Sequence, residues 1–295
     1  QCMLPIGDMQ TVDDALNQVV CGDAADFVRK LPAESADIVV TSPPYWQQRD
    51  YGVEGQYGLE ESMPEYIDRM FHFFEDVKRV LKPKGTLWVN VGDCYNENSG
   101  GYFAHKNNDA PHIGKHRLKT KKYDKLYPRR SLLMIPYRLA IKMIDDGGWT
   151  CRNMIVWRKK IVQPTTAQNR FTIDYEPMFL FAKTNRYFYK KERVKWIVEE
   201  VDDMFSEPSK RERRAVWDLD SDHHGGTGHK APYPIDLAEI PILGGTDEGG
   251  VVLDPFVGSG STICAAKKLG RNFLSCDLSP EFCEMAENRL RLVTV

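Results

Sequence analysis

The run Ala36-Asp37-Ile38-Val39-Val40, followed directly by Thr41-Ser42-Pro43-Pro44-Tyr45-Trp46, is the stretch that decides the fold. Its first part is short, apolar and β-branched, which is typical of a buried strand. Proline cannot continue a strand ladder and restricts the residue before it to an extended backbone, so the chain must leave the sheet here. Ligands of open α/β sheets bind at this carboxyl end of the strands. The sequence therefore predicts either a plain strand-ending turn, or a turn that presents a hydroxyl, a carbonyl and an aromatic wall to a planar base with an exocyclic amino group.

Apolar runs and helical patterns alternate on both sides of this turn. We expect strands at 18–21, 36–40, 86–91, 153–158, 178–183, 251–253 and 272–276. We expect helices that begin near Ala24, Ser62, Pro136, Thr262 and Pro280. A strand–helix–strand order implies parallel strands with right-handed crossovers. The predicted fold class is therefore α/β, with a mostly parallel twisted sheet and helices on both faces.

Length and composition are those of an ordinary globular protein. The 295 residues carry a net charge of -2, and 42% of them are hydrophobic and 28% charged. No apolar run approaches the roughly 20 residues that span a bilayer, and the N-terminus lacks a basic-then-apolar signal pattern. We therefore expect a cytoplasmic protein of a prokaryotic, archaeal or phage-type cell. The seven cysteines lack metal-site spacing, so we expect reduced structural thiols and no metal centre.

Two irregular segments, 96–130 and 185–228, interrupt the regular pattern. Both contain clusters of Lys and Arg residues with interleaved aromatic residues. Such a charge run is usually a solvated loop, but beside a base pocket it is equally consistent with phosphate contact. The candidate residues for contact with a nucleic acid come from these segments, from the polar stretch 159–171 and from the first turn. They are Lys121, Lys122, Arg129, Arg130, Arg170, Arg211, Arg213, Arg214 and Trp46.

A glycine-rich turn follows another buried strand near the C-terminus. It reads Asp254-Pro255-Phe256-Val257-Gly258-Ser259-Gly260 and leads into a helix. Glycine lets the backbone approach a ligand closely and opens the helix N-terminus toward it. The next strand ends in Asp277, and an acidic residue about 20 residues after such glycines is placed to accept both hydroxyls of a ribose. These features favour a nucleoside cofactor.

Together, the two turns resemble those of the amino-group DNA methyltransferases that depend on S-adenosylmethionine. Thr41-Ser42-Pro43-Pro44-Tyr45 is similar to the family's catalytic (Asp/Asn/Ser)-Pro-Pro-Tyr motif, and 254–260 to its cofactor motif. The catalytic motif comes first, which is the circularly permuted order of the beta class. The resemblance implies a Rossmann-like methyltransferase fold with inserted basic DNA-recognition segments. Further similar segments are Cys21-Gly22-Asp23, 169–176 and 229–234, where Tyr233 replaces the usual phenylalanine.

The resemblance also implies a division of the chain and a set of roles. The catalytic half would be 1–184 with the insertion 96–130, the target-recognition segment 185–228, and the cofactor-binding half 229–295. The implied catalytic residues are Ser42, Pro43, Pro44 and Tyr45. Ser42 and the Pro43 carbonyl would accept hydrogen bonds from the amino group, and Tyr45, supported by Trp46, would stack on the flipped-out base. The implied cofactor-binding residues are Asp23, Asp254, Phe256, Gly258, Gly260 and Asp277.

The target base is left open between two amino groups. In the family, serine before Pro-Pro-Tyr is more frequent in cytosine-N4 enzymes and aspartate in adenine-N6 enzymes. Both amino groups present the same two hydrogens, so Ser42 alone does not decide physically, and we favour cytosine N4 with adenine N6 as the alternative. The implied partner is double-stranded DNA, and a cognate restriction endonuclease is a further candidate.

Three other classes of protein share some of these features. RNA and protein-glutamine methyltransferases contain related turns, but in them the cofactor motif precedes the catalytic motif, which is the opposite of the order in this sequence. A dinucleotide-dependent oxidoreductase leaves the Ser-Pro-Pro-Tyr turn and the basic segments unexplained. A non-catalytic DNA-binding module on the same fold would be expected to lose the glycines or the polar group of the catalytic turn, and this sequence keeps both.

Overall fold

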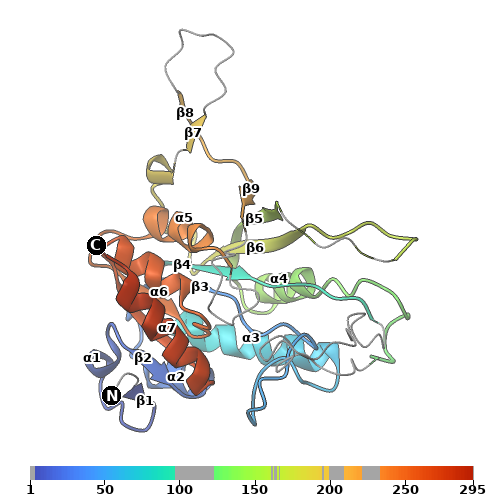
Figure 1. The fold of residues 1–295 in the computed structure, drawn as a ribbon, viewed down its shortest axis with the longest axis horizontal. Helices are drawn as coiled ribbons and strands as arrows, with labels where there is room; N and C mark the ends of the chain where they lie inside the picture. Colours follow the sequence, from blue (N-terminus) through green and yellow to red (C-terminus); the bar gives the residue numbers. More distant parts are fainter. Residues whose placement is uncertain are drawn as a thin grey trace.

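The computed structural model describes residues 4–96, 123–160, 162, 165, 167–194, 196–198, 209–220 and 233–294, with the backbone alone at 196–198 and 209–211. Its centre is a nine-stranded sheet in the order β1-β2-β11-β10-β3-β4-β6-β5-β9 (Figure 1). The strands of this sheet are β1 Leu4–Pro5, β2 Val19–Cys21, β3 Ala36–Thr41, β4 Leu81–Asn90, β5 Thr150–Lys159, β6 Tyr175–Ala182, β9 Val216–Leu219, β10 Val251–Asp254 and β11 Asn272–Asp277. The helices are α1 Val12–Ala15, α2 Ala24–Lys30, α3 Met63–Val80, α4 Ile135–Asp145, α5 Ile235–Gly245, α6 Ser261–Lys268 and α7 Pro280–Leu292, with a 3-10 helix at Lys191–Val194.

Strand β3 lies beside β10 in the middle of the sheet, although the two are far apart in the chain. Val252 pairs with Ile38, and Leu253 with Val39, in parallel register. Strand β10 in turn pairs with β11, and β11 with β2. The turns that follow β3 and β10 therefore leave the sheet at neighbouring points on one edge, and this arrangement positions the site.

Most strand pairs are parallel, as the sequence predicts, and β6 is the exception. The pairs β1–β2, β2–β11, β11–β10, β10–β3, β3–β4 and β5–β9 are parallel. Strand β6 runs antiparallel to both β4 and β5. Its first residues, Tyr175 and Glu176, therefore lie at the edge where the neighbouring strands β4 and β5 end. The reversal brings the start of a strand into the same region as the catalytic turn.

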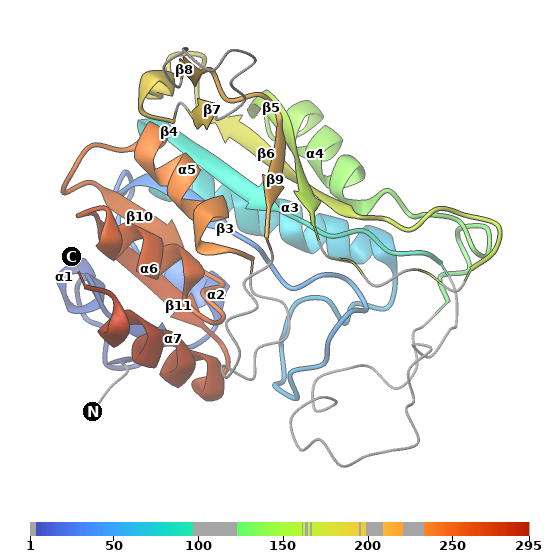
Figure 2. The same cartoon turned by 45° about the horizontal axis from the view of Figure 1, so that its top comes forward.

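Alternate residues of the central strands pack into two cores, because successive side chains of a strand point to opposite faces. Val39 and Leu87 pack with residues of α2, α3 and α4. Ile38, Val40 and Trp88 pack with residues of α5, α6 and α7. Figure 2 shows these two groups of helices on opposite sides of the sheet. Burial on both faces explains why the strands read as continuous apolar runs.

Helix α5 was not expected from the sequence, because Pro241 lies inside it and apolar residues occupy nearly all of its faces, which hides the helical period. The described strands of the segment 185–228 belong to two different sheets. Its strands β7 Trp196–Val198 and β8 Ser209–Arg211 make a hairpin that projects at the top of Figure 1, whereas its strand β9 joins the main sheet beside β5.

No helix in the described part of the chain combines the length and the apolar character that crossing a bilayer requires.

Candidate active site

The Pro43-Pro44 turn after β3 is fixed by contacts with the loop and helix that follow it. The hydroxyl of Tyr66, in α3, donates to the carbonyl oxygen of Pro44 at 2.9 Å. Gly58 lies so close to the turn that a Cβ there would be 2.8 Å from the carbonyl oxygen of Tyr45, and its φ of +92° also suits glycine. The path of the turn is thus set by its neighbours as well as by its prolines.

Trp46, a predicted DNA-contact residue, lies inside the fold. The side chain is 2% exposed and packs in the core beneath the turn. Its Nε1 donates to the carbonyl oxygen of Glu60 at 3.2 Å. A buried indole with a satisfied N–H stabilises the turn from inside the fold. Trp46 can therefore support Tyr45 only indirectly.

Polar side chains from three strands converge on the catalytic turn. The Ser42 hydroxyl donates to the hydroxyl oxygen of Tyr45 at 3.2 Å. The Tyr45 hydroxyl lies 2.8 Å from Asn90 Oδ1, at the end of β4, and 2.8 Å from Glu176 Oε2, at the start of β6. A phenol carries one proton, so Tyr45 donates to one of these two acceptors at a time. The Asn90 amide is oriented by its own bond from Nδ2 to the carbonyl oxygen of Pro177 at 3.1 Å.

Glu176 has a second partner at this edge of the sheet. It forms an ion pair with Lys159, the last residue of β5, and their side chains are 18% and 26% exposed, respectively. A carboxylate held by an ammonium group therefore lies beside the hydroxyl of the predicted catalytic tyrosine.

Sequence reasoning missed Asn90, Lys159 and Glu176 as site residues. The available signal for Glu176 was a charged residue at the start of an otherwise apolar strand. Its position in the site depends on the reversed direction of β6, which the sequence did not reveal.

The surroundings of Tyr45 keep its hydroxyl protonated. Burial raises the pKa of this phenol well above its usual range, and the negative charge of Glu176 raises it further. The hydrogen bond from Ser42 acts in the opposite direction but is outweighed. Gly92 leaves room for the ring, because a Cβ at that position would lie 2.3 Å from a ring carbon of Tyr45. The ring is thus neutral and closely confined.

The turn after β10 is closed by Asp277, the last residue of β11. Its Oδ2 accepts a hydrogen bond from the N–H of Gly258 at 2.9 Å, and its Oδ1 accepts one from the N–H of Ser279 at 2.9 Å. Gly258 and Gly260 have φ values of 50° and 88°, which glycine adopts without strain. Gly260 also packs closely on α7, where a Cβ would lie 3.0 Å from the Cα of Ala286. Both glycines serve the shape of the turn.

Asp277 retains the capacity to bind a ligand. Withdrawal from water raises the pKa of its carboxyl to about 6, against the lowering effect of its backbone hydrogen bonds. A carboxylate has about four acceptor sites on its two oxygens, so the two bonds from the protein leave room for hydroxyl donors. The side chain is also partly exposed. Asp277 can therefore still accept hydrogen bonds from the hydroxyls of a ribose, and this contact stays a prediction.

Asp254, the last residue of β10, is enclosed by the protein. It is 1% exposed, and burial raises the pKa of its carboxyl to about 6. Its Oδ1 accepts hydrogen bonds from the Thr41 hydroxyl at 2.7 Å and from the N–H of Phe256 at 3.2 Å. Its Oδ2 accepts one from the Tyr233 hydroxyl at 3.4 Å. The geometry gives Asp254 a structural role between the two turns, and its predicted contact with the cofactor's ammonium group would have to be added to these bonds.

Tyr233, where the family pattern usually has phenylalanine, belongs to the same buried cluster. Besides Asp254, its hydroxyl contacts Thr262 Oγ1 in a hydrogen bond. Thr262 Oγ1 also donates to the carbonyl oxygen of Val40 in β3 at 3.2 Å. The additional hydroxyl is therefore accommodated by polar partners in the interior.

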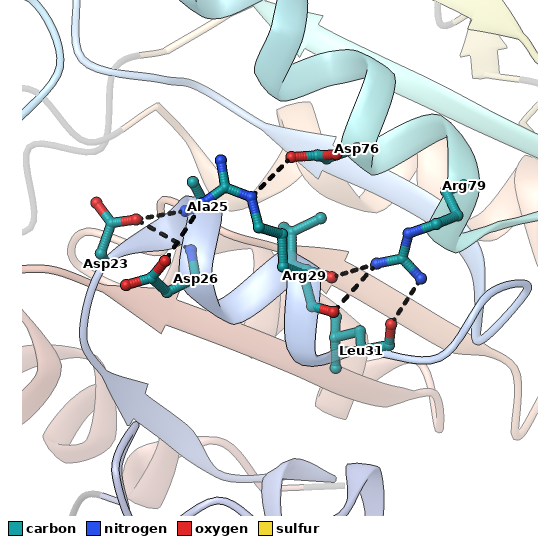
Figure 3. A network of polar contacts seen from close by, with 8 residues as sticks. Asp23, Ala25, Asp26, Arg29, Leu31, Asp76 and Arg79 are labelled. Carbon is teal, nitrogen blue, oxygen red and sulfur yellow. Dashed lines mark hydrogen bonds and ion pairs between the residues drawn. The ribbon is translucent and has the colours of Figure 1, made fainter.

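Asp23 is the N-cap of α2. Its Oδ1 accepts hydrogen bonds from the N–H groups of Ala25 at 2.9 Å and Asp26 at 3.0 Å (Figure 3). Both bonds go to the same oxygen, and the other oxygen points away from the helix in Figure 3. Cys21, two residues earlier, pairs with Asp277 of β11. The two carboxylates thus stand at the ends of adjacent strands.

Arginines anchor α2 against α3 and so fix the position of Asp23. Arg29 Nε lies 3.3 Å from Asp76 Oδ2, and Arg79 donates to the carbonyl oxygens of Val28 at 2.8 Å and Leu31 at 2.9 Å. Figure 3 shows this network between the two helices. These bonds bring side-chain donors to the carbonyl oxygens at the C-terminal end of α2.

The donor and acceptor set of this half fits a nucleoside. Asp23 and Asp277 offer acceptors for amino and hydroxyl donors. Phe256 is a partly buried ring, and its centroid lies 5.6 Å from that of Tyr57 and 4.9 Å from that of Phe73. An apolar wall next to a few placed polar groups is the usual construction of a cofactor site.

The predicted DNA-binding residues fall into different environments. Arg129, Arg130 and Arg214 are exposed, and Arg170 is partly buried with its guanidinium 3.6 Å from the ring centroid of Tyr95. These arginines are positioned to reach a partner. Lys121, Lys122 and the side chain of Arg211 lie outside the described residues.

Arg213 is engaged within the protein, and its predicted DNA contact stays a prediction. Its Nε donates to the carbonyl oxygen of Val194 at 3.3 Å, and its guanidinium lies 5.8 Å from the ring centroid of Trp217. Burial lowers the pKa of the group. These contacts assign Arg213 to the packing of the 185–228 segment on the sheet edge.

Comparison with known proteins agrees with this geometry. The model of the N6_N4_Mtase family, described as DNA methylase, matches residues 36–288. The Type II methyltransferase M.Cfr9I of Citrobacter freundii is 38% identical over 271 residues, which cover 92% of this chain and 86% of that protein.

Solved structures show the same fold. The structure of PvuII DNA methyltransferase (cytosine-N4-specific) has a TM-score of 0.66 at 21% identity and covers 94% of this chain and 90% of that one. A putative DNA modification methylase of Thermus thermophilus, complexed with S-adenosyl-L-methionine, has a TM-score of 0.60 at 25% identity and covers 93% of this chain and 94% of that one.

The fold defines a Rossmann-like methyltransferase, a class that uses S-adenosylmethionine. This chain belongs to the N6_N4_Mtase family and is a DNA methylase of that family.

Proposed function

We propose that this DNA methyltransferase modifies the exocyclic N4 amino group of cytosine, flipped out of the duplex. The observation that carries the proposal is the position of Ser42. Its hydroxyl stands at the carboxyl end of β3, against the hydroxyl of Tyr45, and β3 is the immediate neighbour of the strand that carries the cofactor turn. A serine in this turn is the reason for preferring cytosine N4 to adenine N6, which stays the alternative. The PvuII enzyme, described as cytosine-N4-specific, shares the fold.

Ser42 and Pro43 would make the amino group reactive. The lone pair of an aromatic amine is delocalised into the ring, so the nitrogen is a poor nucleophile. If Ser42 Oγ and the Pro43 carbonyl accept its two hydrogens, the nitrogen is drawn toward a tetrahedral geometry and its lone pair is directed at the methyl donor. Catalysis then depends mainly on positioning and electrostatics.

Tyr45 would hold the base itself. A base inside a duplex cannot reach this edge of the sheet, so it must be flipped out. The ring of Tyr45 is fixed through its hydroxyl by Asn90 and Glu176, and by its close contact with Gly92. Stacking of a base on such a ring contributes about 1–3 kcal/mol.

The cofactor-side residues would place the methyl donor next to this base. S-adenosylmethionine, when bound, supplies an electrophilic methyl group. Asp277 would accept the ribose hydroxyls, Asp23 the adenine amino group, and Phe256 with Gly258 would line the nucleoside. Asp254 would keep the two turns in register through Thr41.

DNA contacts complete the proposal. The exposed arginines Arg129, Arg130 and Arg214, together with Arg170, are candidates for phosphate or base contact. The hairpin β7–β8, which projects from the sheet, is the candidate for target recognition. A cognate restriction endonuclease and a cytoplasmic location belong to the same proposal.

The decisive experiment is methyl transfer from S-adenosylmethionine to mixed-sequence duplex DNA, followed by digestion and mass spectrometry of the nucleosides. N4-methylcytosine supports the proposal. N6-methyladenine would make adenine the target base and would leave the assignment as a DNA methyltransferase unchanged. Absence of any methylated nucleoside, with cofactor binding demonstrated, would favour the non-catalytic DNA-binding alternative.

A further inference from the structure

The hydrogen bonds at the catalytic turn form a directed chain. Ser42 Oγ donates to the oxygen of Tyr45 at 3.2 Å, and the Tyr45 hydroxyl lies within donating distance of Glu176 Oε2 at 2.8 Å. Both donors point the same way, from the predicted position of the amino group toward a carboxylate. We propose that this chain carries away the proton that the amino nitrogen must lose on methylation, and that Glu176 is its acceptor. This inference rests on the proposed function and adds the route of the proton to it.

Among the described residues, Glu176 is the carboxylate to which hydrogen bonds link Ser42, through Tyr45. Thr41, one residue earlier in the strand, points to the opposite face and donates to Asp254 instead. Asp254 is 1% exposed, so a proton delivered there has no direct path to water. Glu176 is 18% exposed, and a proton on its carboxyl can pass to solvent. The face on which Ser42 lies therefore selects the acceptor.

Asn90 and Lys159 determine how the chain operates. Asn90 Oδ1 competes for the Tyr45 proton at the same 2.8 Å, but it is a neutral acceptor, and hydrogen bonds to a charged acceptor are roughly twice as strong. Lys159 holds Glu176 in place by the ion pair. Protonation of Glu176 weakens its ion pair with Lys159. Because loss of the proton restores the full ion pair, Lys159 favours release of the proton to water.

The proton balance is complete within this set. The amino nitrogen forms a bond to the methyl carbon while the carbon–sulfur bond of the donor breaks and its electron pair stays on sulfur. The nitrogen gives one proton to Ser42 Oγ, Ser42 gives its own to Tyr45, and Tyr45 gives its own to Glu176 Oε2. Each hydroxyl ends as it began, and the carboxylate has become a carboxylic acid. The positive charge of the donor and the negative charge of Glu176 are both lost.

Two substitutions separate proton acceptance from mere positioning. Glu176→Gln still accepts a hydrogen bond from Tyr45 but cannot take its proton, and Glu176→Ala leaves a space beside Lys159. In single-turnover methylation of duplex DNA we expect both variants to be slowed on the order of 100-fold, the usual contribution of general acid–base catalysis. Sodium formate, a small carboxylate, should restore Glu176→Ala, whereas sodium chloride at equal ionic strength should not.

Further variants complete the test. Formate should fail to restore the double variant Tyr45→Phe/Glu176→Ala, because the link to Ser42 is broken while the ring remains. Asp174→Asn, which removes an exposed carboxylate two residues away, should keep the wild-type rate. Calorimetric affinity for S-adenosylmethionine should be unchanged in all of these variants, which shows that they are folded.

The rates of these variants test the proton route separately from the proposed function. A wild-type rate in Glu176→Gln, or failure of formate to restore Glu176→Ala, would overturn the proton route. The base that the wild-type enzyme methylates tests the proposed function separately, since the rates of the variants are compared on that same base.

Discussion

Thr41 Oγ1 and Asp254 Oδ1 are joined by a hydrogen bond of 2.7 Å between residues that are 213 positions apart in the chain. Thr41 ends the strand before the catalytic turn, and Asp254 ends the strand before the cofactor turn. Both side chains are inaccessible to water, with 0% and 1% exposure. A displacement of one turn is therefore transmitted to the other.

Asp254→Asn should reduce the dependence of stability on pH. Burial raises the pKa of Asp254 to about 6 from 3.8, so the folded state holds this proton more tightly than the unfolded state. The stabilisation is fully present below the unfolded pKa and is lost as the pH rises through about 6, and a shift of roughly 2 units corresponds to roughly 3 kcal/mol. Urea unfolding at about pH 4 and about pH 7 should show the wild type losing most of this amount relative to the variant. An equal change in both proteins would contradict the assignment.

Asp277→Asn should weaken binding of S-adenosylmethionine and abolish part of its pH dependence. With a pKa of about 6, the wild-type carboxyl loses its charge in mild acid and becomes a weaker acceptor for ribose hydroxyls. Calorimetry should show wild-type affinity falling below about pH 6, and a variant that binds roughly 10- to 100-fold more weakly at neutral pH. Unchanged affinity in the variant would move the ribose contact to another residue.

Ser42→Ala should slow methylation without affecting cofactor binding. It removes one of the two acceptors for the amino group, and loss of one such positioned hydrogen bond costs on the order of 100-fold in turnover. The matched control is Ser35→Ala, which removes only a hydroxyl bonded to the carbonyl oxygen of Pro32 at a distant exposed position. Near-normal turnover of Ser42→Ala in single-turnover assays would exclude the assigned role.

Gly92→Ala should displace the ring of Tyr45. The added Cβ would lie 2.3 Å from a ring carbon, closer than any real contact, so the ring must move. A misplacement of about 1 Å at a reacting centre can cost on the order of 100-fold in rate. Gly7→Ala is the control, because a Cβ there meets nothing within 4 Å. Equal turnover of the two variants would show that the position of Tyr45 does not limit the reaction.

Arg170→Ala and Arg213→Ala should have different effects. Arg170 lies over Tyr95 and is a candidate for DNA contact, so its loss should lower DNA affinity and reduce the salt slope by about 1 if it neutralises a phosphate. Arg213 bonds to Val194 and packs by Trp217, so its loss should lower the free energy of unfolding by about 1 kcal/mol. DNA binding as a function of salt, together with urea unfolding, distinguishes the two. The opposite pattern would exchange the two roles.

Much of the fold and the class of the enzyme could be predicted because the evidence is local. The run 36–40 and the prolines after it define a strand and its end, and the glycines of 254–260 define a second turn of the same kind. Strand and helix periodicity follow from which residues must be buried, and this requires only neighbouring positions in the chain. The prediction was less accurate for α5, whose apolar residues on all sides hide its period.

Other features were decided by tertiary structure alone. The reversed direction of β6 brings Glu176 to Tyr45, and a core beneath the turn encloses Trp46. Tertiary packing, and not residue type, placed the guanidinium of Arg213 near the ring of Trp217 and raised the pKa of Asp254. The physical reason is common to all four: water exclusion and long-range pairing depend on segments far apart in the chain. The sequence by itself determined two turns and their chemistry, and the folded chain decided which side chains surround them.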